Sequence, residues 1–316
     1  MTVETCSRSS VSVSDALRQR TVTGSKRGHR SDAHTIALAL EGGGLRGVIS
    51  AGMAAVVEEL GLIDAFDLVV GTSAGAVNAA ALRAGQIAAF ADAYVDTFSS
   101  RYFIDSRRML LNRPVVRMDR LIDHTSNAFG VSLTDHRYDF PIAFVATSIS
   151  TGKAVPHTDF NDEDDFLGSL AASGLLPLVG GAPVSLRGDR WLDGGLVDPI
   201  PVAAATGLGA THVLVLATRP PATSPRRTPM DGLVERYLHR HNPALGVAYR
   251  GRPAAYLSNA ALSHSDEHPH ARTLVLSPSA GDTIPSRLER DQDVLRQALA
   301  QARVRAHASL AGLVTR

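Results

Sequence analysis

Short apolar runs alternate with longer alanine-rich segments after residue 34, and this alternation limits the fold of the chain more than any other feature. Each short run is typical of a strand buried on both faces, and each longer segment is typical of a helix. The expected strands are residues 35–40, 67–70, 141–150, 153–158, 191–192, 212–217 and 273–276, and the expected helices are residues 46–60, 74–90, 121–129 and 286–313. Such an alternation predicts a three-layer α/β/α fold with a mainly parallel central sheet.

The same pattern suggests how the chain is divided. We expect a single domain over residues 35–316, because strand and helix patterns continue through it without an internal repeat. Residues 219–272 are rich in proline, arginine and histidine and interrupt the pattern, which indicates a surface insertion over one end of the sheet. Residues 1–34 are polar, so we predict a disordered N-terminal tail there.

Charge and cysteine content exclude several classes of protein. Lysine and arginine total 32 against 31 aspartate and glutamate residues, a net charge of +1 that does not favour nucleic acid as a partner. Cys6 is the only cysteine, so the chain cannot form an internal disulfide framework. No apolar run reaches the ~18 residues that a membrane span needs, and the N-terminus lacks the apolar core of a signal peptide. These features predict a cytoplasmic protein.

Basic residues are concentrated in the expected insertion. Residues 219–252 contain seven arginines and two acidic residues, a local charge of +5 (7 − 2). The arginines are interspersed with Leu233, Val234, Tyr237 and Leu238, and basic residues among apolar ones favour peripheral contact with an anionic membrane. A solvated surface helix would show the same pattern, so both interpretations stay open.

A glycine-rich loop lies between the first expected strand and the first expected helix. It reads EGGGLRG and runs from Glu41 to Gly47. Consecutive glycines let backbone N–H groups face an approaching atom, since no Cβ blocks the way. The start of the following helix adds partial positive charge, so the loop suits an anion. It could serve as a phosphate cradle, an oxyanion hole or simply a tight turn.

A second motif, GTSAG, lies between the second expected strand and an alanine-rich helix. Gly71, Ser73 and Gly75 match the pattern G-x-S-x-G, which in this context forms a nucleophile elbow. In such an elbow the chain turns sharply and presents the serine hydroxyl, while the two glycines let strand and helix approach each other. Ser73 is therefore the candidate nucleophile.

A third motif, Asp193-Gly194-Gly195, follows a short apolar strand. A carboxylate before two glycines can point into a cleft from a tightly bent loop. Taken alone, an aspartate before glycine is more typical of an ordinary turn. Asp198, five residues further on, could cap this loop or perturb Asp193.

Together these three motifs, in this order, resemble the patatin-like phospholipase family. The segments 172–177 and 147–153 also resemble the family's sequence before its catalytic aspartate, and the likeness covers roughly residues 35–217. The resemblance implies a patatin-like fold and a serine acyl hydrolase that acts on lipid esters with a Ser–Asp dyad, without a catalytic histidine, a metal or a cofactor.

The resemblance also implies a role for each motif residue. Ser73 matches the nucleophile and Asp193 the general base. The remaining positions match the oxyanion hole (the N–H groups of Gly43, Gly44 and Leu45), the glycine-loop motif (Gly42, Gly44, Arg46 and Gly47), the elbow (Gly71 and Gly75) and the Asp-Gly-Gly motif (Gly194 and Gly195).

Two other functions remain possible from the sequence. A histidine, such as His212, His264, His268 or His270, could complete a Ser-Asp-His triad of the α/β-hydrolase kind. Alternatively, the glycine loop could bind a dinucleotide, which would require an acidic residue at the end of the second strand. That strand ends instead in the GTSAG motif, and Asp67 precedes it.

Overall fold

The computed structural model describes residues 11–111, 113–223, 228–264 and 270–314. Within these residues one sheet of eight strands has the order β5-β6-β3-β2-β1-β7-β8, and β4 pairs with β3 outside this path. The strands are β1 (Ile36–Leu40), β2 (Leu68–Thr72), β3 (Ile142–Ser148), β4 (Ala154–His157), β5 (Val184–Leu186), β6 (Asp189–Asp193), β7 (His212–Leu216) and β8 (Arg272–Leu276). β1, β2, β3, β7 and β8 are parallel, while β4, β5 and β6 are antiparallel to their neighbours.

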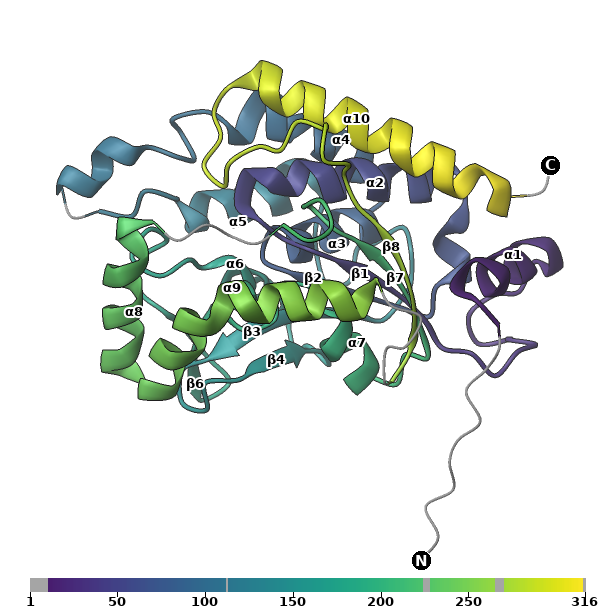
Figure 1. Cartoon of the computed structure of the whole chain (residues 1–316), viewed down its shortest axis with the longest axis horizontal. Coiled ribbons are helices and arrows are strands. Elements are labelled where there is room, and N and C mark those ends of the chain that lie inside the picture. Colours follow the sequence, from purple (N-terminus) through teal and green to yellow (C-terminus); the bar gives the residue numbers. More distant parts are fainter. Residues whose placement is uncertain (1–10, 112, 224–227, 265–269, 315–316) are drawn as a thin grey trace, which may run out of the picture.

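Helices cover both faces of this sheet, and Figure 1 shows α2 and α10 on one side and α7 and α9 on the other. Strand β1 shows why both faces need cover: all its residues are buried, and their side chains alternate between two apolar cores, one on each face of the sheet. Leu38 belongs to the core with the first set of helices, and Ala39 belongs to the core with the second. The first set is α2 (Val48–Glu59), α3 (Ala74–Arg83), α4 (Ile87–Ala93), α5 (Met118–Phe129), α6 (Glu163–Gly174) and α10 (Gln292–Leu310), and the second is α7 (Val202–Gly207), α8 (Pro229–His241) and α9 (Pro243–Ser263).

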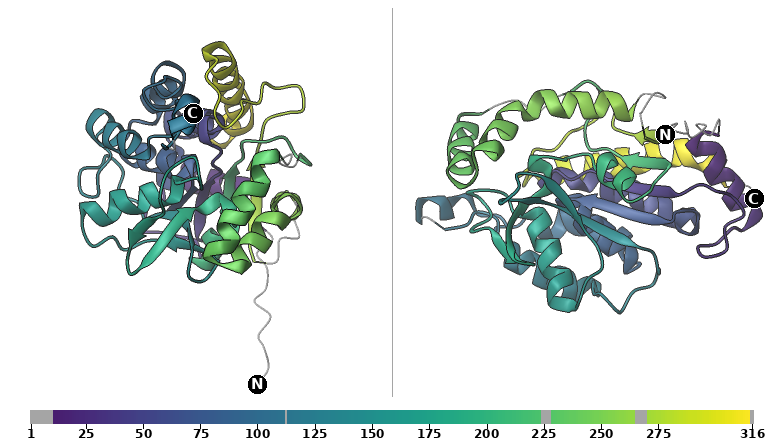
Figure 2. Two further views of the ribbon diagram at one scale, coloured as in Figure 1. Left: turned by 90° about the vertical axis from the view of Figure 1, so that its left-hand side faces the viewer. Right: turned by 90° about the horizontal axis from the view of Figure 1, so that it is seen from below.

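The three-layer α/β/α fold with a mainly parallel sheet is therefore confirmed, and the two views of Figure 2 show the same layers. The helix expected over residues 74–90 is broken into α3 and α4, because Gly85 adopts a φ of +72° between them. The last helix begins at Gln292, later than expected. None of the described helices is long and apolar enough to span a bilayer.

The N-terminal segment differs from expectation. Residues 11–34 are ordered around the helix α1 (Val13–Thr23), so the prediction of a disordered tail is wrong for this part, while residues 1–10, including Cys6, lie outside the described residues. Val13, Ala16, Leu17 and Arg20 are buried at helical spacing and pack on the body of the protein. The helix is short and only four of its residues are buried, so the composition of the segment stays polar and does not indicate a folded element.

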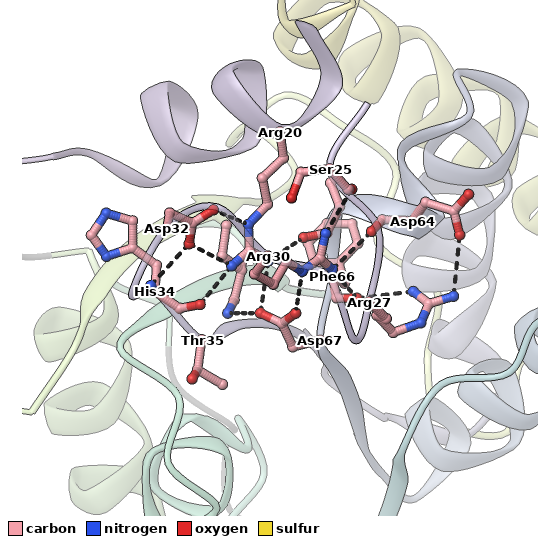
Figure 3. Close-up of polar contacts among 12 residues, drawn as sticks. Arg20, Ser25, Arg27, Arg30, Asp32, His34, Thr35, Asp64, Phe66 and Asp67 are labelled. Atoms are coloured by element: carbon pink, nitrogen blue, oxygen red, sulfur yellow. Dashed lines mark hydrogen bonds and ion pairs between the residues drawn. The ribbon is translucent and has the colours of Figure 1, made fainter. Parts of the chain in front are cut away.

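Arg20 connects this helix to the sheet (Figure 3). Its guanidinium binds Asp32 through Nε and Nη2 at 2.9 and 2.8 Å, and Nη1 binds Asp67 at 2.7 Å. Asp67 in turn accepts a hydrogen bond from the Ile36 N–H at 2.7 Å and an ion pair from Arg30. The two carboxylates compensate the buried charge, which is the condition for burying an arginine. This network ties the starts of β1 and β2 together at the edge of the sheet opposite the two glycine motifs.

Within the expected insertion, residues 229–241 and 243–263 form α8 and α9, which lie on the second face of the sheet (Figure 1). Val234 and Leu238 of α8 are buried against Leu245 of α9 and Leu192 of β6. The apolar residues that suggested membrane contact therefore largely face the protein, although Leu233 is exposed.

Candidate active site

Two loops meet at the carboxyl edge of the sheet because β1 and β2 are parallel neighbours. Leu40 at the end of β1 lies opposite Gly71 of β2, so the glycine loop and the GTSAG turn leave the sheet side by side. A Cβ on Gly42 would lie 2.6 Å from the Ser73 Cβ, closer than real Cβ atoms approach. The residue at position 42 must therefore be glycine for the first loop to rest on Ser73.

Ser73 lies in a strained turn between β2 and α3. Its φ of 58° and ψ of −128° are unusual for a residue with a side chain, and such strain costs on the order of 1–3 kcal/mol. A Cβ on Gly71 would lie 2.4 Å from the Gly75 carbonyl oxygen, and one on Gly75 would lie 2.2 Å from the Leu40 carbonyl oxygen. The geometry is that of the expected elbow, with both glycines placed where strand and helix approach each other.

Ser173, at the end of α6, holds this turn from behind. Its hydroxyl accepts a hydrogen bond from the Ser73 N–H at 3.0 Å and donates to the Val145 carbonyl at 2.6 Å. All three residues are buried. The elbow is thus fastened to β3 and α6, so the strained conformation is held by several independent elements.

Asp193 reaches Ser73 from the end of β6, which pairs with β3. The Ser73 hydroxyl donates to Asp193 Oδ2 at 2.7 Å, and the Gly195 N–H donates to Asp193 Oδ1 at 2.7 Å. A Cβ on Gly194 would lie 2.1 Å from the Val145 carbonyl oxygen, so this turn also needs glycine. The sequence thus brings together two side chains that are 120 positions apart.

Burial changes the acidity of Asp193. Desolvation raises its pKa from 3.8 to about 6, although the hydrogen bonds from Ser73 and Gly195 and the charge of Arg252 act in the opposite direction. A carboxylate with a pKa nearer to neutrality is a better proton acceptor than an exposed one. The pair can therefore move the Ser73 proton to Asp193.

The glycine loop presents backbone N–H groups beside Ser73. Gly43 and Gly44 have φ values of +151° and +60°, and within the described residues neither N–H donates to a protein acceptor. Leu45 differs from expectation, because its N–H donates to the Arg287 carbonyl at 2.9 Å. That hydrogen bond occupies the third expected oxyanion donor and fixes the loop instead. Gly47 packs against α3, where a Cβ would lie 2.7 Å from the Ala74 Cβ.

Arg46 supports the loop from below. Its buried guanidinium lies against Gly43, where a Cβ would be 2.6 Å from Arg46 Nη2. Arg46 Nε donates to the Thr218 hydroxyl at 3.1 Å, and that hydroxyl donates to the Gly42 carbonyl at 3.0 Å. Thr218 follows β7, so Arg46 links the loop to the neighbouring strand rather than lying in solvent.

Two cavities meet at Ser73. The first is lined by the glycine loop, Ser73, Asp193 and four arginines, Arg46, Arg219, Arg252 and Arg287. The second is lined mainly by apolar side chains, among them Val77, Phe90, Phe98, Ile104, Val116 and Leu121. Ser73 therefore lies between a basic cavity and an apolar cavity.

The described histidines lie elsewhere. His212 is at the start of β7 and His270 precedes the start of β8, so both lie at the edge of the sheet opposite Ser73. His264 ends α9. Among the described residues no histidine lines either cavity, whereas His268 lies outside them.

Asp198 lies in the turn that follows the Asp-Gly-Gly motif. Its N–H donates to the Gly194 carbonyl at 2.9 Å, so its backbone closes this turn. Its carboxyl is buried, which raises its pKa to about 7, and Oδ1 has no hydrogen-bond partner among the described residues.

Comparison with known proteins agrees with this geometry. The sequence profile of the patatin-like phospholipase family matches residues 38–206, which is more than half of the 316 residues. The chain belongs to this family. The matched region contains Ser73, Asp193 and the glycine loop, so the resemblance drawn from the three motifs is confirmed.

Several curated proteins are similar over part of their length. An uncharacterized protein of Escherichia coli, YjjU, is 30% identical over 189 residues, which are 58% of this chain and 52% of YjjU. An uncharacterized NTE family protein of Mycobacterium tuberculosis H37Rv is 25% identical over 213 residues, 66% of this chain and 56% of that protein. Lysophospholipase NTE1 of Mycosarcoma maydis is 29% identical over 191 residues, 58% of this chain and 10% of that protein. The chain spans about half the length of the first two.

Solved structures of low identity also match. The match to VipD from Legionella pneumophila spans 88% of this chain and 67% of VipD, with 12% identity and a TM-score of 0.43. Human GIVD cytosolic phospholipase A2 covers 95% of this chain, which covers 62% of that protein, at 13% identity and a TM-score of 0.38.

Sequence patterns did not identify the residues that α9 contributes to the site. Arg252 and Tyr256 line the basic cavity, yet they come from the segment expected to be a surface insertion. The signal was present, since Tyr249, Arg252, Tyr256 and Ala260 are buried at spacings of three and four residues along one helix face.

Proposed function

We propose that this protein is a serine hydrolase of lipid esters, with Ser73 as nucleophile and Asp193 as general base. The observation that carries the proposal is the 2.7 Å hydrogen bond from the Ser73 hydroxyl to Asp193, made in a strained strand-to-helix turn. A nucleophile hydrogen-bonded to a base that is itself oriented by a third group is the usual signature of covalent catalysis. Here the orienting group is the Gly195 N–H.

In the first half of the proposed reaction Ser73 Oγ attacks the ester carbonyl carbon while Asp193 takes the hydroxyl proton. The carbonyl oxygen becomes an oxyanion, and in this proposal the N–H groups of Gly43 and Gly44 stabilise it. One such donor typically contributes ~2.7–4 kcal/mol. The tetrahedral intermediate then collapses: the bond to the alcohol oxygen breaks, Asp193 returns the proton to that oxygen, and the acyl group stays on Ser73.

In the second half water replaces the alcohol. Asp193 accepts a proton from the water as it attacks the acyl-enzyme, and the proton passes to Ser73 Oγ when the acyl–serine bond breaks. The products are a fatty acid and the alcohol. The apolar cavity beside Ser73 supports a long acyl chain as the acid component, because its lining offers mainly carbon surface.

A fluorophosphonate probe tests this function directly, because it forms a covalent bond only with an activated serine. We expect the full-length protein to be labelled, the adduct to map to the peptide that contains Ser73, and a long-chain nitrophenyl ester to compete with labelling. Labelling at another serine, or none in a protein that is folded by circular dichroism, would contradict the proposal.

We further propose that the protein meets anionic membranes through the tip of residues 106–111 rather than through α8. Met109, Leu110 and Leu111 are 47%, 89% and 68% exposed, and Figure 1 shows the segment projecting at the left edge of the molecule. Six arginines against two aspartates within residues 101–120 give a local charge of +4 (6 − 2). Ile104, which precedes the tip, lines the apolar cavity, so an acyl chain could pass from the bilayer to Ser73.

Vesicle flotation distinguishes the two segments. The double variant Leu110→Ser, Leu111→Ser is expected to lose about tenfold in binding to vesicles rich in phosphatidylglycerol, because two exposed apolar side chains no longer enter the interface. Leu233→Ser, at the exposed leucine of α8, is the matched control and should bind like the parent. Contact through the tip would be refuted if only the Leu233→Ser control lost vesicle binding, or if binding did not depend on anionic lipid and on salt concentration.

A further inference from the structure

The basic cavity beside Ser73 contains more positive charge than its own carboxylates balance. Four arginines and two carboxylates, Glu41 and Asp193, are in its lining. Glu41 is fully buried and accepts hydrogen bonds from the Thr218 N–H at 2.6 Å and the Tyr256 hydroxyl at 3.0 Å. Burial raises the pKa of Glu41, while the charges of Arg46 and Arg219 lower it. Even with both carboxylates ionised, two positive charges remain.

Arg252 contacts Tyr249, yet one of its donors, Nε, is used by no described residue. Its side chain comes from the middle of α9 and is only 9% exposed, yet its Nε has no hydrogen-bond partner among the described residues. The guanidinium lies 5.5 Å from the ring centre of Tyr249, which orients its plane. A buried guanidinium with an unused donor is costly unless something else binds it.

Arg219 and Arg287 line the same cavity from two other elements. Arg219 follows β7 and lies 5.9 Å from the Tyr256 ring, and Arg287 precedes α10. Within the described part of the chain none of the arginines at 219, 252 and 287 forms an ion pair with a carboxylate. Planar guanidinium groups on several sides of a cavity suit a phosphate group, which accepts paired hydrogen bonds.

We propose that Arg252 and Arg219 form a subsite for a phosphate monoester group on the alcohol part of the ester substrate. This inference rests on the proposed hydrolase function of Ser73. The acyl chain occupies the apolar cavity, the ester carbonyl lies at Ser73, and the phosphate lies among the arginines. The phosphate takes no part in bond breaking and leaves on the alcohol when the acyl–oxygen bond is cleaved. A choline ester of the same phosphate would bring a cation into a basic cavity and should react more slowly.

Three esters with one acyl chain test the selectivity: 1-oleoylglycerol, 1-oleoylglycerol 3-phosphate and the choline ester of the latter. We expect the phosphate monoester to have a kcat/KM at least about tenfold higher than either of the others. Equal rates for all three esters would refute the subsite while leaving the hydrolase function intact. Failure of the hydrolase function would look different, since no ester would react and no fluorophosphonate adduct would form.

Variants then locate the subsite. Arg252→Gln is expected to lower kcat/KM for the phosphate monoester by roughly 10- to 100-fold, because a hydrogen bond to a charged group is lost. Because the charge of Arg252 also acts on Asp193, the rate on 1-oleoylglycerol can change too, so the quantity to compare is the ratio of the two kcat/KM values, which should fall at least about tenfold in the variant. Arg250→Gln is the matched control, since Arg250 is on the same helix but is exposed outside the cavity. An equal loss on both substrates would show that Arg252 has only a structural role.

Inorganic phosphate separates a head-group site from a site for the free ion. We expect millimolar phosphate to inhibit hydrolysis of 1-oleoylglycerol weakly in the parent and not in Arg252→Gln. Inhibition by phosphate without any preference for the phosphate ester would assign the arginines to a free anion and overturn the head-group proposal. Arg219→Gln, measured on the same substrates, provides a second variant should Arg252→Gln fail to fold.

Discussion

Ser73→Ala should reduce ester hydrolysis by a factor on the order of 10⁴ or more and abolish labelling by a fluorophosphonate. The reason is that the variant removes the atom that forms the acyl–enzyme bond, and members of such a catalytic unit contribute together. The protein should stay folded, because the Ser73 N–H to Ser173 bond does not involve the side chain of Ser73.

Ser99→Ala is a suitable control for this experiment. Ser99 is also buried, its hydroxyl donates to the Val95 carbonyl four residues earlier, and Ser99 itself lines neither cavity. We expect this variant to keep activity within about threefold of the parent. A folded Ser73→Ala protein with substantial esterase activity would show that another residue is the nucleophile.

Asp193→Asn is expected to slow hydrolysis by the ~10²–10⁴-fold that general-base catalysis contributes. The asparagine amide can still accept from the Gly195 N–H and donate to Ser73 Oγ, so the turn is kept while the proton acceptor is lost. Single replacements of His212, His264, His268 and His270 should each leave activity within several-fold of the parent. Collapse of the rate at one histidine, in a folded variant, would indicate a triad.

The pH dependence follows from the same residue. Because Asp193 must be ionised to accept a proton, kcat/KM should rise with pH through about 6, the raised pKa of its carboxyl, and level off above it. Stability should change in the opposite sense. A folded-state pKa above the unfolded value means that this carboxyl binds more protons in the native protein between about pH 4 and 6, so its contribution to stability falls as pH rises through that window.

Thermal melting at pH 7.5 checks this sign. At this pH the buried Asp193 carboxylate is ionised, and its desolvation lowers the free energy of unfolding. Asp193→Asn removes the charge, so the variant should melt at the same temperature as the parent or higher. A much lower melting temperature would show that the carboxylate stabilises the fold, and loss of activity in that variant could no longer be assigned to the missing base.

The layers of the fold could be predicted from sequence because they depend on local pattern. Residues 36–40 and 68–70, before the glycine loop and the GTSAG turn, are apolar at every position, and both segments lie in fully buried strands. Ser73 and Asp193, which the structure brings into contact, could also be singled out from sequence, since each lies at a strand end beside glycines that close packing requires. These features are local in sequence, so they leave a local signal.

The residues that sequence did not identify depend on long-range contacts. Arg252 is 179 positions from Ser73 (252 − 73). The spacing of its neighbours indicates a helix with one buried face, but it does not indicate that this face is directed toward the glycine loop. Residues 11–34 were misjudged for a similar reason, because one of the two carboxylates that bind Arg20, that of Asp67, lies outside this segment. The Leu45 N–H was misassigned since its acceptor, the Arg287 carbonyl, lies near the other end of the chain.

The spread of the site along the chain determines when the protein could become active during its synthesis. Ser73 leaves the ribosome early, but its partner Asp193 follows 120 residues later. Glu41, at the start of the glycine loop, can form its hydrogen bonds only after Thr218 and Tyr256 have been synthesised, 177 and 215 positions later. At roughly 5–20 residues per second, the gap from Ser73 to Asp193 alone lasts several seconds or more. On the proposed mechanism, a nascent chain therefore carries Ser73 without its general base until residue 193 has been synthesised.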